Sequence, residues 1–258
     1  MVVVPNAANS SVVIGTVERI LESRDVRLID QSPSTAIIAV QGPKSPEVIA
    51  DIGLAVELPY LGFVERDTDH GHVLLARTGY TGEHGYELLV DSAEADYWWA
   101  ELASAANAVG GRVCGLGARD TLRTEMGYAL HGHELSLDIN PVEAGVGWAV
   151  GWDKIAFPGS SALKSIRESG PERKLVGLQF LDRGIPRAGM IVAASADSSA
   201  VLGKTTSGTF SPTLKQGIAL ALLDSEVELG QVVSVDVRGR SCRAEIVRPP
   251  FVGSNPRA

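Results

Sequence analysis

Residues 79–87 read GYTGEHGYE and join two apolar stretches, residues 72–77 and 86–90, that are rich in strand-forming side chains. Three glycines in so short a span make a turn that few other residues can follow. The pattern therefore predicts a hairpin with a long loop, and loops of this kind often carry binding residues. An aromatic residue, Tyr80, and a carboxylate, Glu87, lie at the two ends of the loop.

A second glycine-rich stretch, GLGARDTLR at residues 115–123, leads into a helix predicted over residues 118–126 and contains Arg119. A carboxylate accepts hydrogen bonds from an amino-pyrimidine edge, an arginine holds a carbonyl or carboxylate, and tyrosine covers a flat face. Tyr80, Glu87 and Arg119 therefore suggest a site for a flat, polar heterocycle. Taken alone, Glu87 and Arg119 also fit an exposed carboxylate and a surface charge or structural ion pair.

The chain on either side of the loop predicts an α+β fold with two domains. Before the hairpin we expect a short strand, a helix, a strand and a helix, at residues 2–4, 10–23, 36–40 and 46–52. After it, helices are expected at residues 94–109, 118–126 and 160–168. The first domain, residues 1–170, is thus predicted to combine an antiparallel sheet with helices.

The composition changes at residue 171, where short strands separated by turns begin. They are expected at residues 175–180, 190–193, 218–223, 232–237 and 242–246. Residues 208–212, GTFSP, are interpreted as a turn between strands rather than as a nucleophile elbow. This spacing is typical of a small β-barrel, which we place at residues 171–258.

Composition narrows the classes of function. Of 258 residues, 45% are apolar and 21% charged, which is ordinary for a folded protein. The net charge of −8 argues against a nucleic-acid partner, because phosphate binding needs a positive field. We expect no membrane span and no signal peptide, and therefore a cytoplasmic protein. The two cysteines, Cys114 and Cys242, are expected to be buried reduced thiols.

The sequence gives little support for a metal site, a catalytic cysteine or a dinucleotide-binding site. Two pairs of histidines, 70/72 and 131/133, lack a third ligand nearby in the sequence, so no metal site is predicted. Neither cysteine has a neighbouring histidine to activate it. The stretch GLG at 115–117 lacks the third glycine and the acidic residue of a dinucleotide site.

At these residues the chain resembles the T protein of the glycine cleavage system, the aminomethyltransferase family. The similar stretches extend over nearly the whole sequence. They are RTGYTGEHGYEL (77–88), GLGARDTLRTEMGYALHGHEL (115–135), INPVEAGVGWAV (139–150), FPG (157–159), RGIPRAGMIV (183–192), GKTTSGTFSPTLKQGIALALL (203–223) and PPFV (249–252).

The resemblance implies binding of tetrahydrofolate. The family's pterin-binding carboxylate falls on Glu87, its folate-contacting arginine on Arg119 and its binding tyrosines on Tyr80 and Tyr128. Asn6, in VVPNAAN, resembles the asparagine that begins a helix beside the folate. The implied reaction transfers an aminomethyl group from the lipoyl arm of the H protein to folate and releases ammonia. The enzyme would act mainly by positioning and electrostatic support.

One departure concerns the family's catalytic aspartate, which precedes the VVPNAAN-like stretch. Here that stretch begins at Val3, so the aspartate would lie upstream of Met1 and no catalytic residue is predicted. We accordingly expect weak or absent transfer activity, and an unpaired sheet edge that favours self-association. The alternative function is a non-catalytic folate-binding fragment or remnant.

Two related families fit less well. The folate-binding proteins of iron–sulfur cluster assembly carry lysine-glycine-cysteine-tyrosine in this loop, where this chain has RTGY at residues 77–80. The folate domains of dimethylglycine and sarcosine dehydrogenases accompany a flavin domain, which this sequence lacks. Both readings are therefore disfavoured.

Overall fold

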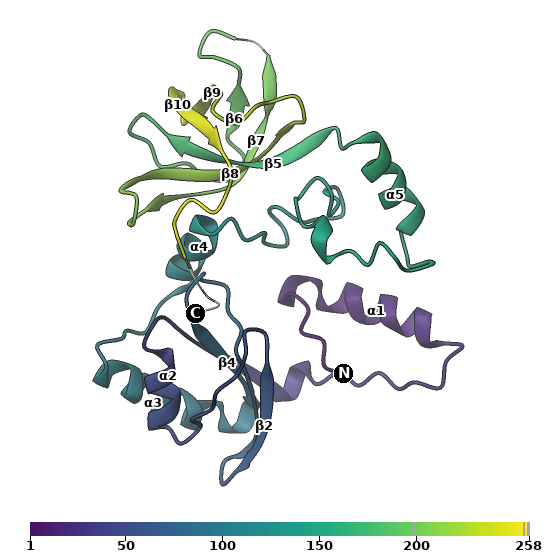
Figure 1. Cartoon of the computed structure of the whole chain (residues 1–258), viewed down its shortest axis with the longest axis vertical. Helices are drawn as coiled ribbons and strands as arrows, with labels where there is room; N and C mark the ends of the chain where they lie inside the picture. The colour runs from purple at the N-terminus through teal and green to yellow at the C-terminus, as the bar shows by residue number, and fades with distance from the viewer. Residues whose placement is uncertain (199, 255, 257–258) are drawn as a thin grey trace. The chain divides into compact units, whose positions relative to one another are not determined.

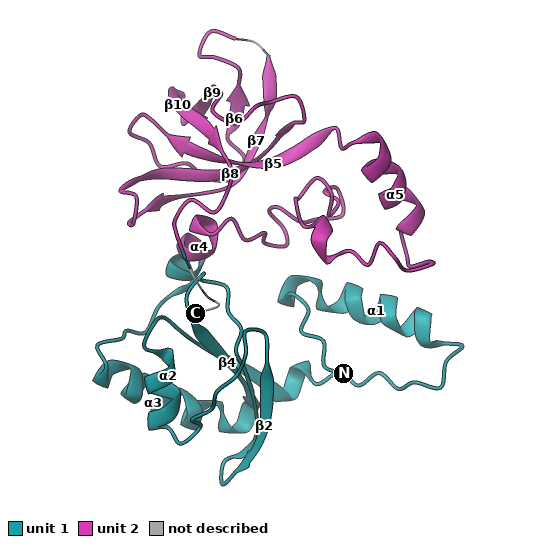
Figure 2. Cartoon of the chain, viewed as in Figure 1, with its two compact units in different colours: residues 1–119, 254–258 teal, residues 120–253 magenta. Residues whose placement is uncertain are grey.

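The computed structural model describes residues 1–198, 200–254 and 256, which fall into two compact units (Figure 2). Unit 1 comprises residues 1–119 and 254–258, and unit 2 comprises residues 120–253. The first holds an antiparallel sheet with helices and the second a closed barrel, which confirms the predicted fold class. The division falls within helix α4 (Leu116–Glu125), and the domain boundary at residues 170/171 stays a prediction.

The sheet of unit 1 has the strand order β1-β4-β3-β2. Figure 1 labels two of its strands, β2 and β4. Its strands are β1 (Thr35–Gln41), β2 (Phe63–Thr68), β3 (Gly71–Ala76) and β4 (Gly85–Asp91). Strands β3 and β4 pair antiparallel, so the predicted hairpin around the glycine loop is confirmed. The register places Glu87 opposite Ala76 of β3 and Ala39 of β1, in the middle of the sheet.

Helices α2 (Ser45–Asp51) and α3 (Ala95–Ala108) pack against this sheet, and η3 (Ser92–Glu94) leads into α3. The buried face of α3 contains Trp98, Leu102 and Ala105, as its helical spacing predicts. These side chains share a core with Leu75 and Leu88 of the central strands. The core therefore fixes the two strands from which the glycine loop extends.

Among the first 34 residues, the expected helix is present at Ser10–Leu21, but the expected strand is not. Residues 2–4 form no strand, and the prediction there is wrong. Valine favours strands, but in the described part of the chain no strand pairs with Val2, Val3 or Val4, which are 58%, 61% and 59% exposed. The other elements are η1 (Ala7–Asn9), α1 (Ser10–Leu21) and η2 (Ser32–Ser34), and none of them contains a buried residue.

Unit 2 contains a closed barrel with the strand order β10-β5-β8-β7-β6-β9. The strands are β5 (Arg173–Phe180), β6 (Ile191–Ala193), β7 (Val201–Ser211), β8 (Gln216–Asp224), β9 (Val232–Val237) and β10 (Arg240–Val247). Residues 208–211 end strand β7, so the interpretation of 208–212 as a turn is wrong. The barrel encloses an apolar core that includes Leu178, Val192 and Ala244.

Residues between α4 and the barrel are tied to strand β5. They include η4 (Gly147–Ala149) and α5 (Ser160–Ser169). Arg173 donates from Nε to Oε1 of the buried Glu143 at 2.9 Å, and the Leu175 amide donates to the Glu143 carbonyl at 2.8 Å. Asn140 donates from Nδ2 to Glu143 Oε2 at 2.8 Å. Segment 139–150 is thereby anchored to the first barrel strand.

Two further observations concern features singled out in the sequence. Cys242 is buried, but Cys114 is exposed, so the expectation of two buried thiols is wrong for Cys114. Cys114 follows α3 in a segment without regular structure, where its side chain is exposed. None of the helices in the described residues is both long enough and apolar enough to span a membrane.

Candidate functional site

The carboxylate of Glu87 is held by the strand that follows the glycine loop. Glu87 is half-buried, and Thr78 donates a hydrogen bond from Oγ1 to Glu87 Oε2 at 2.5 Å. Thr78 lies at the start of the loop and Glu87 just after its end, so this bond closes the loop at its base. It also restrains the carboxylate, whose two oxygens can together accept several hydrogen bonds.

Arg119 lies against the ring of Tyr80, a residue of the glycine loop. The guanidinium carbon of Arg119 lies 4.7 Å from the centroid of the Tyr80 ring, a cation–π contact. Arg119 lies in the first turn of α4 and is exposed. The structure thus brings two of the predicted site residues into direct contact, while Glu87 lies on the strand that ends the same loop.

The interior of the loop is filled by the side chain of Gln41, at the end of β1. Its Nε2 donates to the carbonyl oxygens of Thr78 at 3.1 Å and Tyr86 at 3.2 Å. Its Oε1 accepts a hydrogen bond from Oγ1 of Thr81 at 3.0 Å. Sequence reasoning missed Gln41 because a strand glutamine carries no motif that marks it as special.

The position of Gln41 explains two of the loop glycines. A Cβ at Gly79 would lie 2.0 Å from Gln41 Oε1, and a Cβ at Gly85 would lie 2.4 Å from Gln41 Cδ. Gly82 has φ of +78°, a conformation that side chains rarely adopt. The glycines therefore have two roles. Gly79 and Gly85 leave room for the amide of Gln41, and Gly82 allows the chain to turn.

The remaining predicted residues, Asn6 and Tyr128, have local roles in the structure. Asn6 Oδ1 accepts a hydrogen bond from the Ala8 amide at 3.1 Å and caps η1. Tyr128 belongs to unit 2, where its carbonyl oxygen accepts a hydrogen bond from Arg123 Nη1 at 3.2 Å. Their part in a ligand site stays a prediction.

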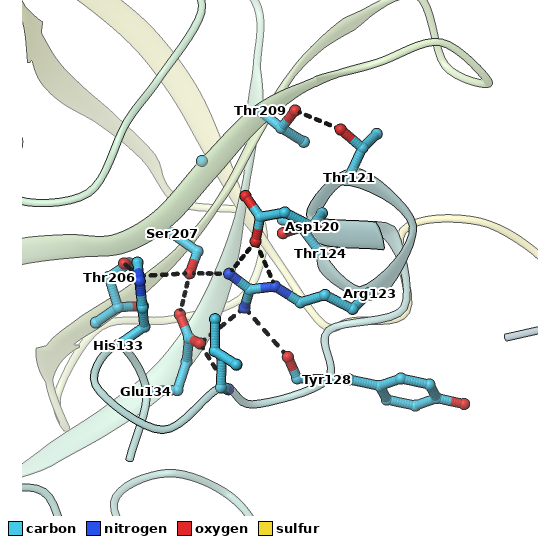
Figure 3. A network of polar contacts seen from close by, with 12 residues as sticks. Asp120, Thr121, Arg123, Thr124, Tyr128, His133, Glu134, Thr206, Ser207 and Thr209 are labelled. Carbon is cyan, nitrogen blue, oxygen red and sulfur yellow. Dashed lines mark hydrogen bonds and ion pairs between the residues drawn. The ribbon is translucent and has the colours of Figure 1, made fainter. Parts of the chain in front are cut away.

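Arg123 is the centre of a buried polar network in unit 2 (Figure 3). Its side chain is 1% exposed, and Nε and Nη2 donate to Asp120 Oδ1 at 2.8 and 2.6 Å. Nη1 donates to Oε2 of the fully buried Glu134 at 2.8 Å. Nη2 also donates to Ser207 Oγ of strand β7 at 2.6 Å. A buried guanidinium is tolerated because charged and polar acceptors surround it.

The same network holds the chain after α4. Ser207 Oγ donates to Glu134 Oε1 at 2.6 Å, and the Leu130 amide donates to Glu134 Oε2 at 3.0 Å. Together with the bond from Arg123 to the Tyr128 carbonyl, these contacts fix residues 128–134 against the barrel. Sequence reasoning missed the network because Arg123 and Glu134 have the composition of surface residues, and burial is not visible in composition.

The glycine loop also contains a half-buried histidine, His84. His84 Nδ1 lies 3.0 Å from Ser45 Oγ, and Ser45 Oγ donates to the His84 carbonyl at 3.2 Å. Burial lowers the pKa of His84, and the positive charge of Arg77 lowers it further. Burial likewise raises the pKa of the neighbouring Tyr86. Both groups are therefore biased toward their neutral forms.

In the described residues, the two pairs of histidines noted in the sequence are not part of a cluster of side chains that could bind a metal ion. His70 stacks on Tyr97 with ring centroids 3.4 Å apart, and His72 Nδ1 lies 2.9 Å from Asp67 Oδ1. His133 Nδ1 lies 2.8 Å from the Thr206 carbonyl. Over residues 1–198, 200–254 and 256, no group of three or more His, Cys, Asp or Glu side chains is arranged to hold a metal ion.

Comparison with known families identifies both parts of the chain. The model of the GCVT N-terminal domain matches residues 1–154. The model of the glycine cleavage T-protein C-terminal barrel domain matches residues 173–253.

Individual relatives agree with the family models. The aminomethyltransferase of Parafrankia sp. (strain EAN1pec) is 52% identical over 254 residues, which are 98% of this chain and 69% of the relative. That of Mycobacterium avium (strain 104) is 49% identical over 251 residues, 96% of this chain and 67% of the relative. The crystal structure of glycine cleavage system aminomethyltransferase T from Bartonella henselae superposes with a TM-score of 0.86 at 29% identity, covering 96% of this chain and 67% of that one.

Proposed function

Because the chain belongs to the glycine cleavage T-protein family and is an aminomethyltransferase of the glycine cleavage system, we propose that it binds tetrahydrofolate at the glycine loop. The family uses tetrahydrofolate as its co-substrate. The observation that carries the proposal is the oriented carboxylate of Glu87, beside a loop whose other end bears the Tyr80–Arg119 pair.

Glu87 suits the amino-pyrimidine edge of a pterin. That edge presents neighbouring N–H donors, and a carboxylate can accept two of them at once. The bond from Thr78 occupies one side of Oε2 and sets the orientation of the group before a ligand arrives. A carboxylate that is already oriented loses less conformational entropy on binding than a freely rotating one.

Tyr80 and Arg119 supply the other half of the proposed site. The aromatic ring offers a flat apolar surface, and the guanidinium offers donors for a carbonyl or carboxylate of the ligand. Their contact at 4.7 Å restrains both side chains. Asn6 and Tyr128 complete the proposed set on the strength of the family resemblance.

The proposed partner is the lipoylated H protein, which carries the aminomethyl group on its dihydrolipoyl arm. In the transfer, the carbon loses its bonds to the sulfur of the arm and to the amine nitrogen, and gains bonds to two folate nitrogens. Ammonia and the dihydrolipoyl arm are released, and 5,10-methylenetetrahydrofolate is formed. The residues described above hold and orient the folate for this step, and none is assigned a proton-transfer role. A cytoplasmic location stays a prediction.

A single-turnover assay tests the proposal. Aminomethyl-loaded H protein and tetrahydrofolate are mixed with an excess of the chain, and 5,10-methylenetetrahydrofolate and ammonia are quantified. Glu87→Ala should lower the rate at subsaturating folate about tenfold or more, the loss expected for a charged hydrogen-bond acceptor. Glu83→Ala, at an exposed carboxylate of the same loop, is the matched control and should leave the rate unchanged.

Two outcomes of these measurements would contradict part of the proposal. Equal rates for Glu87→Ala and the unaltered chain would reject the assignment of the site. Glu87-dependent folate binding without any product would favour a folate-binding role alone.

A further inference from the structure

We infer that Gln41 is a positioning residue of the folate site: its amide fixes the glycine loop and, through Thr78, the carboxylate of Glu87. The inference rests on the proposed function, since it concerns the same site. The side chain of Gln41 fills the interior of the loop, so it acts through the residues that it holds.

The amide of Gln41 contacts the loop at three separate places. Nε2 donates to the carbonyl oxygens at both ends of the loop, those of Thr78 and Tyr86, and Oε1 accepts from the Thr81 hydroxyl. One side chain therefore uses both amide hydrogens and its oxygen. A carboxylate of the same size would lose both donors and place a negative charge against two carbonyl oxygens.

These contacts flank the proposed ligand-binding residues. Thr78 is held through its carbonyl by Gln41, and its hydroxyl in turn donates to Glu87 Oε2 at 2.5 Å. Tyr86, the residue immediately before Glu87, is held through its carbonyl. Thr81, which follows Tyr80, donates to the same amide. Each proposed contact of the loop therefore lies next to a bond made by Gln41.

The surrounding backbone leaves the amide little freedom. Gly79 and Gly85 face it so closely that a Cβ at either position would overlap it. The loop and the glutamine are thus complementary in shape as well as in hydrogen bonding. A side chain that cannot replace these bonds would leave the loop without internal support, and Glu87 would lose its fixed orientation.

A double-mutant cycle on tetrahydrofolate affinity, measured by isothermal titration, tests the inference. The variants are Gln41→Met, Glu87→Ala and the double variant. The control is Gln179→Met, which makes the same exchange at a half-buried glutamine of strand β5. Gln41→Met should raise Kd about tenfold, as expected when an outer supporting residue is lost. The double variant should bind within about twofold of Glu87→Ala, because Gln41 acts on affinity largely through Glu87.

A purely structural role for Gln41 predicts a different result, in which the two losses multiply. The inference would be overturned if the increase in Kd for the double variant equals the product of the two single increases. It would also be overturned if Gln41→Met leaves Kd unchanged. If Glu87→Ala alone leaves Kd unchanged, the proposed site fails instead, and the two failures are thereby distinguished.

A milder variant guards against loss of folding. Thr81→Val removes one of the three bonds to the amide while keeping the side-chain volume. It should raise Kd about threefold, a fraction of the effect of Gln41→Met, and show the same lack of additivity with Glu87→Ala. Full additivity of Thr81→Val with Glu87→Ala would count against the positioning role.

Discussion

The guanidinium of Arg119 lies over the ring of Tyr80, its central carbon 4.7 Å from the ring centroid. The contact joins the start of helix α4 to the glycine loop within unit 1. Since Arg119 is otherwise exposed, the aromatic ring restrains a side chain that would rotate freely in water. The pair can therefore meet a ligand in one prepared arrangement.

This arrangement depends on the planar shape of arginine. Arg119→Lys keeps the positive charge but loses the fork of donors and the stacking surface, so tetrahydrofolate should bind about tenfold more weakly. Because the residue is exposed, the free energy of unfolding should change by less than about 0.5 kcal/mol. Titration calorimetry and denaturant unfolding measure the two quantities. Unchanged folate affinity would exclude Arg119 from the site.

Breaking the buried pair of Arg123 and Glu134 should destabilise unit 2 more than breaking an exposed ion pair. Glu134→Ala removes the fully buried carboxylate from the Arg123 guanidinium, which keeps its two bonds to Asp120, and should cost about 3 kcal/mol of unfolding free energy. Denaturant unfolding followed by a probe of the barrel measures the loss. Arg243→Ala breaks the exposed pair with Asp182 and should leave the midpoint where it is. Equal effects of the two variants would contradict this reading of the network.

A side chain at residue 79 should displace the amide of Gln41 from the glycine loop. Gly79→Ala would force the Gln41 amide out of its place and should destabilise unit 1 by about 1–3 kcal/mol. Gly117→Ala is the control, because a Cβ there meets nothing within 4 Å. A thermal melt of both variants makes the comparison. If Gly79→Ala melts with the unaltered chain, the close fit of loop and glutamine is not required for stability.

His84 should make unit 1 sensitive to mild acid. Its folded pKa is lowered from 6.5, so below that value the unfolded chain binds more protons than the folded one. The contribution of His84 to stability is therefore full above its unfolded pKa and is lost as the pH falls toward the folded pKa.

The variant His84→Asn should abolish this part of the pH dependence. Its stability difference from the unaltered chain should shrink steadily as the pH is lowered from 7 to 5 in a series of thermal melts. A difference that stays constant over this range would show that His84 does not titrate differently in the two states.

Apolar patterns correctly predicted three of the four strands in the sheet of unit 1, β1, β3 and β4, together with helices α1, α2 and α3. The two strands with little apolar alternation were missed. Strand β2, with the sequence FVERDT, is largely exposed and rich in charge, and β7 contains TTSGTFS at residues 205–211. In β7, Ser207 and Ser211 are buried because their hydroxyls bond to Arg123, Glu134 and Glu125. Polar residues that are buried by such partners cannot be recognised before the partners are known.

Residues of the candidate site could be predicted from the sequence only where a local motif marks a residue whose chemistry suits a ligand. Glu87, Tyr80 and Arg119 are marked by the glycine-rich motifs around them, and two of the three meet in space. Gln41 is close to residues 78–86 only because β1 pairs with β4, a contact between segments about forty residues apart. Such a long-range pairing is a property of the fold, and the local pattern around Gln41 does not contain it.

The central claim is that this chain binds folate through the carboxylate of Glu87. Isothermal titration of tetrahydrofolate into the unaltered chain, Glu87→Ala and the control Glu83→Ala tests it most directly. We predict saturable binding by the unaltered chain and the control, with a Kd for Glu87→Ala that is about tenfold or more higher. Binding of equal strength by all three proteins, or no binding by the unaltered chain, would contradict the claim.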